Sequence, residues 1–203
     1  MSMFREHWIG GLSSYSVFFL LSLVVTISVS ISYGLSFDWN PTISMNPVEI
    51  IGCFVVALLF GLFPDVDIKS RSQKVFYSVL FVLNCSLILI FQMYLESALL
   101  GLFAMLPILS KHRGWTHSKI SMILLPSLFL VIPLYAEYSG YGIGWEELPV
   151  IFDTLVEYEN LPETFHSGIA FYVAGLIGYA SHLYLDGILF RSRKSQRRKK
   201  RAN

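Results

Sequence analysis

Four short polar motifs interrupt this largely apolar chain, and they contain four of its five histidines. Imidazole nitrogens and carboxylate oxygens bind divalent metal ions, and they also transfer protons in acid and base catalysis. Polar groups near a bilayer core are costly, so those found there usually face a cavity or a site. The motifs are Glu6-His7, Pro64-Asp65-Val66-Asp67, the segment Lys111–Ser118 and the segment Ser181–Asp186. Their composition predicts a metal site.

The rest of the sequence indicates a membrane protein. Hydrophobic residues make up 54% of the chain and charged residues 14%, which is far from the composition of a soluble domain. A span needs about 20 apolar residues. We therefore expect an all-α bundle, with the long apolar block Val75–Leu109 split near Gln92–Ser97. The other expected spans are Ser13–Tyr33, Val48–Phe63, Ile120–Tyr135 and Gly168–Phe190.

The distribution of charge predicts the orientation. All fifteen Lys and Arg residues lie in four segments, whereas residues 136–167 contain seven acidic residues and no Lys or Arg. Short basic loops stay in the cytoplasm. About six spans with both termini cytoplasmic satisfy this rule and predict a multi-pass inner-membrane protein. The basic segments are Arg5, Lys69–Lys74, Lys111–Lys119 and the tail from Arg191 to Arg201.

The chain divides into a transmembrane domain, residues 1–190, and a basic cytoplasmic tail, residues 191–203. The tail follows a span directly and has no aromatic residue. Attraction to anionic lipid head groups explains it more simply than nucleic-acid binding. Membrane lipids are therefore the expected partners.

Cys53 and Cys85 fall within apolar runs and favour neither a disulfide nor a thiolate zinc site.

The predicted topology places all four motifs at cytoplasmic ends of spans. Pro64 disfavours helix at the preceding residue, so Asp65 and Asp67 are expected in an extended or turn-like stretch. In an extended stretch their side chains point the same way. Such a pair forms a hard cation site or an acid/base pair, and the alternative is a helix-ending turn with solvated acids.

The second motif combines two histidines with an arginine. His112 and His117 are five residues apart and converge only if His112 lies in the loop and His117 in the first turn of the next span. Thr116 or Ser118 would then cap that helix. Arg113 is suited to bidentate phosphate binding. The alternative is an interfacial loop that carries cations for topology alone.

The last motif places His182 and Asp186 one turn apart on one helical face. If the span continues to Phe190, His182 lies about 12 Å from that end, where it needs a partner such as a metal. The alternative is a His–Asp pair that ties helices together. His7 could equally be an interfacial terminal residue, and His166 is expected to face solvent in the acidic loop.

Taken together, PDVD, HRGWTHS and GYASHLYLD, preceded by His7, resemble the membrane-bound metal-dependent hydrolase family. Its members are also described as YdjM-like, LexA-regulated hydrolases associated with the inner membrane. The resemblance extends from His7 to Asp186, with HRGWTHS as its most specific part. One departure is Ile68, where many members would carry a histidine. The distant similarity of that family to zinc-dependent phospholipases C implies phosphoester hydrolysis.

The sequence therefore predicts a metal-dependent hydrolase acting at the cytoplasmic face, with a phospholipid or polyprenyl-phosphate type of lipid as substrate. A mixed His/Asp shell suits Zn²⁺, or Mn²⁺ or Fe²⁺, better than Ca²⁺. Such an ion would acidify a bound water and polarise the phosphoryl oxygen. The expected core ligands are Asp65, His117, His182 and Asp186, and His7, Asp67 and His112 complete one or two metal positions.

Two catalytic roles follow from this prediction. Arg113 would neutralise charge on the phosphate, and Asp67 would take the proton from the attacking water. A metal or proton transporter is the first alternative, although a transporter should place its ionisable groups near the midplane. A non-enzymatic membrane scaffold, tied together by the same motifs, is the second.

Overall fold

The computed structural model describes residues 2–67, 70–90, 92–107, 115–131 and 163–190. These residues form helices and turns without a β-strand. Four helices are long and apolar enough to cross a membrane. The elements in order are α1 (Ser2–Tyr33), η1 (Phe37–Trp39), α2 (Pro47–Leu62), η2 (Phe63–Asp67), α3 (Arg71–Leu89), α4 (Tyr94–Met105), α5 (Lys119–Leu124) and α8 (Glu163–Leu185).

Local capping residues set the helix boundaries. Asn46 accepts a hydrogen bond from the Val48 amide, with Pro47 at the first helical position of α2. Ser70 accepts from the Gln73 amide at the start of α3. Serine and asparagine fill these positions because their side-chain oxygens satisfy amides that have no partner within the helix. The sequence thus encodes where these helices begin.

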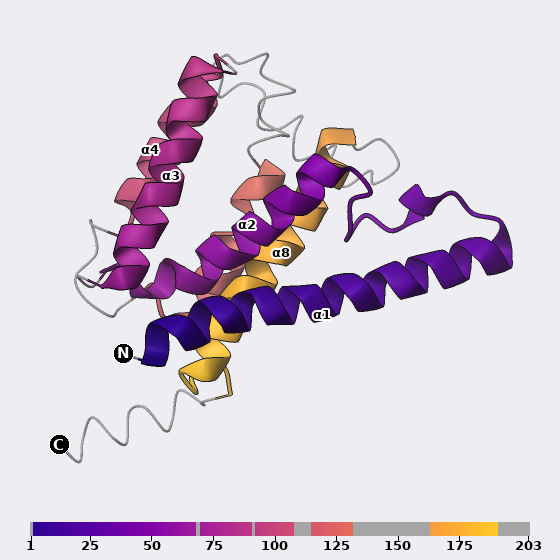
Figure 1. The fold of residues 1–203 in the computed structure, drawn as a ribbon, viewed down its shortest axis with the longest axis horizontal. Helices are drawn as coiled ribbons and strands as arrows, with labels where there is room; N and C mark the ends of the chain where they lie inside the picture. Colours follow the sequence, from indigo (N-terminus) through magenta and orange to yellow (C-terminus); the bar gives the residue numbers. More distant parts are fainter. Residues whose placement is uncertain (1, 68–69, 91, 108–114, 132–162, 191–203) are drawn as a thin grey trace.

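Helices α1, α2 and α8 pack against one another through small residues (Figure 1). A Cβ atom at Gly178 would lie 2.2 Å from the carbonyl oxygen of Ala57, and one at Gly11 would lie 3.2 Å from the same oxygen. Glycine is therefore required for α8 to approach α2 this closely. Small residues at helix crossings are typical of membrane bundles, where close van der Waals packing drives association.

Helices α3 and α4 form a hairpin beside this three-helix unit (Figure 1). The predicted split of the apolar block is confirmed, because α3 ends at Leu89 and Gln92 adopts a positive φ of 55° before α4 begins. Helix α4 has 12 residues, about 18 Å. That is shorter than the hydrocarbon core of about 30 Å. Six spans and cytoplasmic termini remain predictions.

Aromatic side chains fill the centre of the bundle. The rings of Phe60 and Tyr179 lie 6.2 Å apart, and those of Phe63 and Tyr179 lie 5.9 Å apart. Phe103 of α4 packs on Phe63 at 5.4 Å. By contrast, α1 exposes Val17, Leu20, Leu21 and Val24. In a membrane such a surface faces lipid, so the long apolar helices and their exposed flanks agree with a multi-pass protein.

One local expectation was wrong, and a second was narrowed to one of its alternatives. The last helix ends at Leu185, not Phe190, because Gly187 has a φ of 66° and the Ile188 amide turns back to the Leu183 carbonyl. His182 therefore lies one turn from the helix end and not 12 Å from it. Residues 63–67 form a 3-10 turn, the turn-like of the two expected conformations, and so lack the extended backbone that would align Asp65 with Asp67. With three residues per turn, side chains two apart do not share a side.

Candidate metal centre

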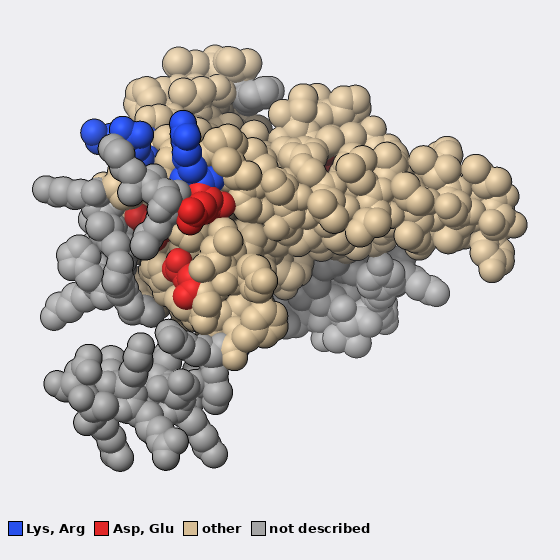
Figure 2. Space-filling view, turned by 60° about the horizontal axis from the view of Figure 1, so that its bottom comes forward, with Lys and Arg blue, Asp and Glu red and all other residues tan. Residues whose placement is uncertain are grey.

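Five of the predicted ligands meet at one end of the three-helix unit. His7 comes from α1, Asp65 from η2, His117 from the turn before α5, and His182 and Asp186 from the C-terminal end of α8. In Figure 2 the visible Lys and Arg side chains (blue) lie beside the Asp and Glu side chains (red) at one end of the molecule. Four segments far apart in sequence thus build one cluster.

Each of the three imidazoles approaches both carboxylates through its Nε2 atom. His182 Nε2 lies 3.7 Å from Asp65 and 3.4 Å from Asp186. His117 Nε2 lies 3.8 Å and 3.4 Å from the same two groups. His7 Nε2 lies 3.9 Å and 3.6 Å from them. The five side chains form two three-residue groups that share His182, namely His7, Asp65 and His182, and His117, His182 and Asp186.

Helix α2 fixes the orientation of His182. The side chain is fully buried, and its Nδ1 atom lies 2.7 Å from the backbone carbonyl oxygen of Gly61. A carbonyl can only accept, so Nδ1 carries the hydrogen and donates it. The Nε2 atom is then directed into the cluster, where this buried atom has no hydrogen-bond partner among the described residues and is available as a metal ligand when it carries no hydrogen. A metal-binding histidine typically uses its second nitrogen in this way.

His7 stacks on His182. Their ring centroids lie 3.9 Å apart with an angle of 17° between the planes, and His7 is 3% exposed. Two buried, stacked imidazoles repel each other if both are protonated, so at least one neutral ring is favoured here. An imidazole whose Nε2 atom carries no hydrogen can bind a metal there but cannot donate from that atom to a carboxylate.

The turn that carries His117 is held by three neighbours. The Tyr179 hydroxyl of α8 donates to the backbone carbonyl of Thr116, and Thr116 Oγ1 lies 3.3 Å from His117 Nδ1. Ser118 is the N-cap of α5 and accepts from the Ser121 amide at 3.0 Å. The predicted cap at Ser118 is thus confirmed, and α8 fixes the turn that presents His117.

The two carboxylates form the open side of the cluster. The side chains of Asp65 and Asp186 are 24% and 25% exposed, whereas that of His182 is buried. The ring of His117, whose Nε2 atom lies 3.4 Å from Asp186, is the main cause that holds the pKa of the Asp186 carboxyl well below its ordinary value. Asp186 is therefore ionised at neutral pH. The cluster presents its carboxylates toward solvent and its imidazoles toward the protein interior.

The distances in the cluster fit a metal ion better than direct pairing. Charge-assisted hydrogen bonds between nitrogen and oxygen are about 2.7–2.9 Å long, and the six His–Asp separations are 3.4–3.9 Å. Ligands about 2.1 Å from a zinc ion lie about 3.4 Å apart in a tetrahedral shell. Three imidazoles and two carboxylates are a donor set for Zn²⁺, Mn²⁺ or Fe²⁺.

Other predicted residues lie outside what the structure describes. His112 and Arg113 belong to residues 108–114, and the side chains of Asp67 and His166 are likewise not described. The 3-10 turn removes the argument that Asp65 and Asp67 point the same way, so the role of Asp67 remains a prediction. The basic tail and residues 132–162 of the acidic loop are also outside the described part.

Sequence reasoning missed the groups that position the ligands. These are the Gly61 carbonyl, the Tyr179 hydroxyl and the close contact of Gly178 with Ala57. The sequence did contain a signal for this close packing, because small residues precede two of the predicted ligands at four-residue intervals. Ala57 and Gly61 precede Asp65, and Ala174 and Gly178 precede His182. Such spacing marks one helix face that approaches a neighbour closely.

Comparison with known proteins places the chain in a family. The family described as YdjM inner membrane protein matches residues 19–192, a region that includes Asp65, His117, His182 and Asp186. No curated protein and no solved structure matches the chain. The match covers most of the sequence, and four described helices have membrane-spanning length. The chain therefore belongs to the YdjM inner membrane protein family and is a multi-pass protein of the inner membrane.

Proposed function

We propose that this protein is a metal-dependent hydrolase that cleaves a lipid phosphoester at the cytoplasmic face of the membrane. The observation that carries the proposal is the convergence of three imidazole Nε2 atoms on two carboxylates at 3.4–3.9 Å. The buried, unpartnered Nε2 of His182 adds support, because an orphaned polar atom is costly unless it has a ligand.

In this proposal His7, Asp65, His117, His182 and Asp186 hold one or two divalent ions, with Zn²⁺ preferred. When bound, such an ion polarises a phosphoryl oxygen and makes water more acidic. The partly exposed carboxylates leave an approach for the substrate from the aqueous side. Asp67 accepts the proton of the attacking water and His112 completes the ligand set, roles that rest on the sequence alone.

Arg113 binds the phosphate and neutralises the charge that develops on it. It follows His112 and lies four residues before His117 in the sequence, so the chain brings it close to the metal ligands. A planar guanidinium pairs with two phosphate oxygens at once. This assignment also rests on the sequence, and it separates substrate binding from metal binding.

The position of the cluster favours a hydrolase over a transporter. Phe60, Phe63 and Tyr179 pack together on the interior side of the ligands. A permeation path would need ionisable groups near the midplane and access from both faces. The ligands instead lie near helix ends, a depth at which a lipid phosphate meets water. These features support a lipid substrate over a soluble one.

The reaction is tested with purified, metal-loaded protein and mixed membrane lipids. We expect release of a phosphorylated head group or inorganic phosphate, and a chelator should abolish it. Arg113→Ala should lower the rate about a hundredfold or more while keeping the metal, because Arg113 is assigned to the substrate. Arg71→Ala, at the start of α3, is the matched control and should retain activity.

Two outcomes would refute the substrate assignment. One is full activity in the Arg113→Ala protein. The other is a metal-loaded wild type that cleaves only soluble esters or amides. Neither result contradicts metal binding by the cluster. The metal-binding part and the substrate part of the proposal can therefore fail separately.

A further inference from the structure

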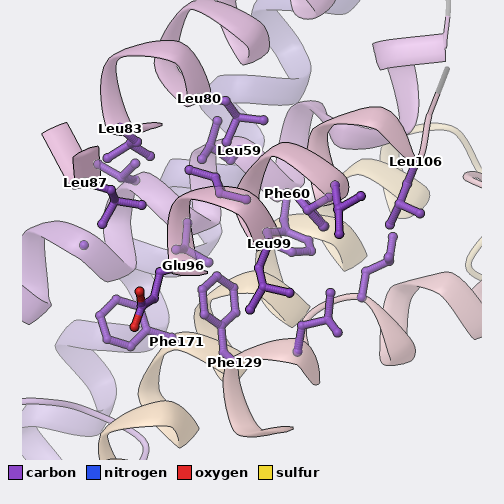
Figure 3. Close-up of a pocket in the computed structure, with 18 of the residues that line it drawn as sticks. Leu59, Phe60, Leu80, Leu83, Leu87, Glu96, Leu99, Leu106, Phe129 and Phe171 are labelled. Atoms are coloured by element: carbon purple, nitrogen blue, oxygen red, sulfur yellow. The ribbon is translucent and has the colours of Figure 1, made fainter. Parts of the chain in front are cut away.

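A large apolar cavity lies between α2, the α3–α4 hairpin, the helical segment that begins with α5, and α8 (Figure 3). Its volume is about 690 Å³, within the range of about 300–1,000 Å³ that is typical of ligand pockets. Leucine, valine and phenylalanine side chains dominate the lining. Glu96 is the one ionisable residue among the described residues that line it. The cavity is thus suited to a mostly hydrocarbon ligand.

The cavity has the length of a lipid chain in one leaflet. Along α2 its lining extends from Val48 to Phe60, about 18 Å at the rise of an α-helix. One leaflet is half of a hydrocarbon core about 30 Å thick, or about 15 Å, so the cavity is about as long as the lipid chains of one leaflet. Helix α2 is long and apolar enough to span the membrane, so the cavity lies at the depth of lipid chains. Lipid, and not water, is the medium that can fill it.

Glu96 lies at the end of the cavity that is remote from the metal centre. It is in the first turn of α4 and shares the lining with Gly52 and Phe171. Gly52 precedes Asp65 by thirteen residues, which is about 20 Å along the chain if helical rise applies throughout. The two sites therefore occupy opposite ends of the bundle.

The carboxylate of Glu96 stands apart from the other polar groups that the structure describes. Within the described part of the chain, no hydrogen bond or ion pair reaches it. An unpaired charge beside apolar walls is costly, and a cation that reaches it reduces that cost. An ammonium group supplies both the positive charge and hydrogen-bond donors. Charge complementarity thus defines the polar end of the ligand.

We propose that this cavity binds a membrane phospholipid with a primary ammonium head group. A hydrocarbon chain occupies the space along α2, and the ammonium group pairs with Glu96 at the outer end. This lipid site is separate from the metal centre and does not depend on the proposed hydrolysis. The partner is a lipid of the leaflet opposite the metal centre.

The test uses full-length protein reconstituted in bilayers of equal parts phosphatidylethanolamine and phosphatidylglycerol, then extracted into detergent. Lipid that remains bound is quantified by mass spectrometry. The wild type should retain phosphatidylethanolamine about tenfold in excess over phosphatidylglycerol, the factor expected from one charge-assisted hydrogen bond. Glu96→Gln should return this ratio to that of the bilayer. Glu49→Gln, in the first turn of α2 and outside the lining, should keep the excess.

A second variant tests the chain-binding part. Leu99→Trp adds bulk inside the cavity and should lower the total lipid retained, with an unchanged thermal unfolding temperature in detergent as a check on folding. The proposal is overturned by a wild type that retains no lipid or shows no preference. It is also overturned by an unchanged preference in Glu96→Gln, or by undiminished lipid in folded Leu99→Trp.

Discussion

At the scale of single residues, the cluster depends on groups that never touch a metal. The Gly61 carbonyl fixes the ring of His182, and Tyr179 holds the Thr116 carbonyl beside His117. Residue types and spacing predicted that these five side chains lie together, because His and Asp in apolar segments need partners. They could not predict the Gly61 contact, since every residue carries a carbonyl and only the packing of α8 on α2 selects this one.

Tyr179→Phe tests this supporting role. Loss of the hydroxyl frees the turn that presents His117, so metal affinity should fall about tenfold or more, measured by titration against a competing chelator. Tyr77→Phe is the matched control, because its hydroxyl donates to the Ala104 carbonyl at 3.0 Å in the α3–α4 hairpin. Equal affinities in the two variants would show that Tyr179 does not position the ligand.

At the scale of elements, the cluster exists because α1, α2 and α8 approach closely at glycine. Sequence patterns predicted the long helices, the split before α4 and the Ser118 cap. At residues 63–67 they left an extended and a turn-like stretch open, and the chain forms a 3-10 turn. They failed at the end of α8, where Gly187 and the return of the Ile188 amide to Leu183 stop the helix early.

Gly178→Ala tests the close approach. Its Cβ would lie 2.2 Å from the Ala57 carbonyl, so α8 must shift from α2 and the protein should lose about 1–3 kcal/mol of stability. Thermal unfolding in detergent measures this loss. At Gly101 of α4 a Cβ meets only Asn84 at 3.8 Å, and Gly101→Ala should not destabilise. A Gly178→Ala protein as stable as Gly101→Ala would disprove the close contact.

At the scale of the whole molecule, the predicted topology decides whether the cluster faces the cytoplasm. The helical class and multi-pass character followed from composition and apolar length. The number of spans does not follow from length alone, because the 12 residues of α4 are too few to cross the hydrocarbon core even without tilt. The orientation rests on the segregation of Lys and Arg from acidic residues.

Reporter fusions test this orientation. A reporter active only in the cytoplasm should work after Lys74, after Lys119 and at Asn203, because short basic segments remain inside. A reporter active only outside should work within Glu146–Glu159. Cytoplasmic activity from the acidic segment would refute the six-span topology.

The central claim is that the five-residue cluster binds a divalent metal, and elemental analysis tests it most directly. Protein purified in detergent without added metal should carry zinc, manganese or iron in near-stoichiometric amount. His182→Ala should lose most of it, because one ligand and its backbone anchor disappear together. His166→Ala, sixteen residues earlier in α8 and about 24 Å away along the helix, should keep the wild-type content. A wild type without metal, or equal metal in wild type and His182→Ala, would contradict the account.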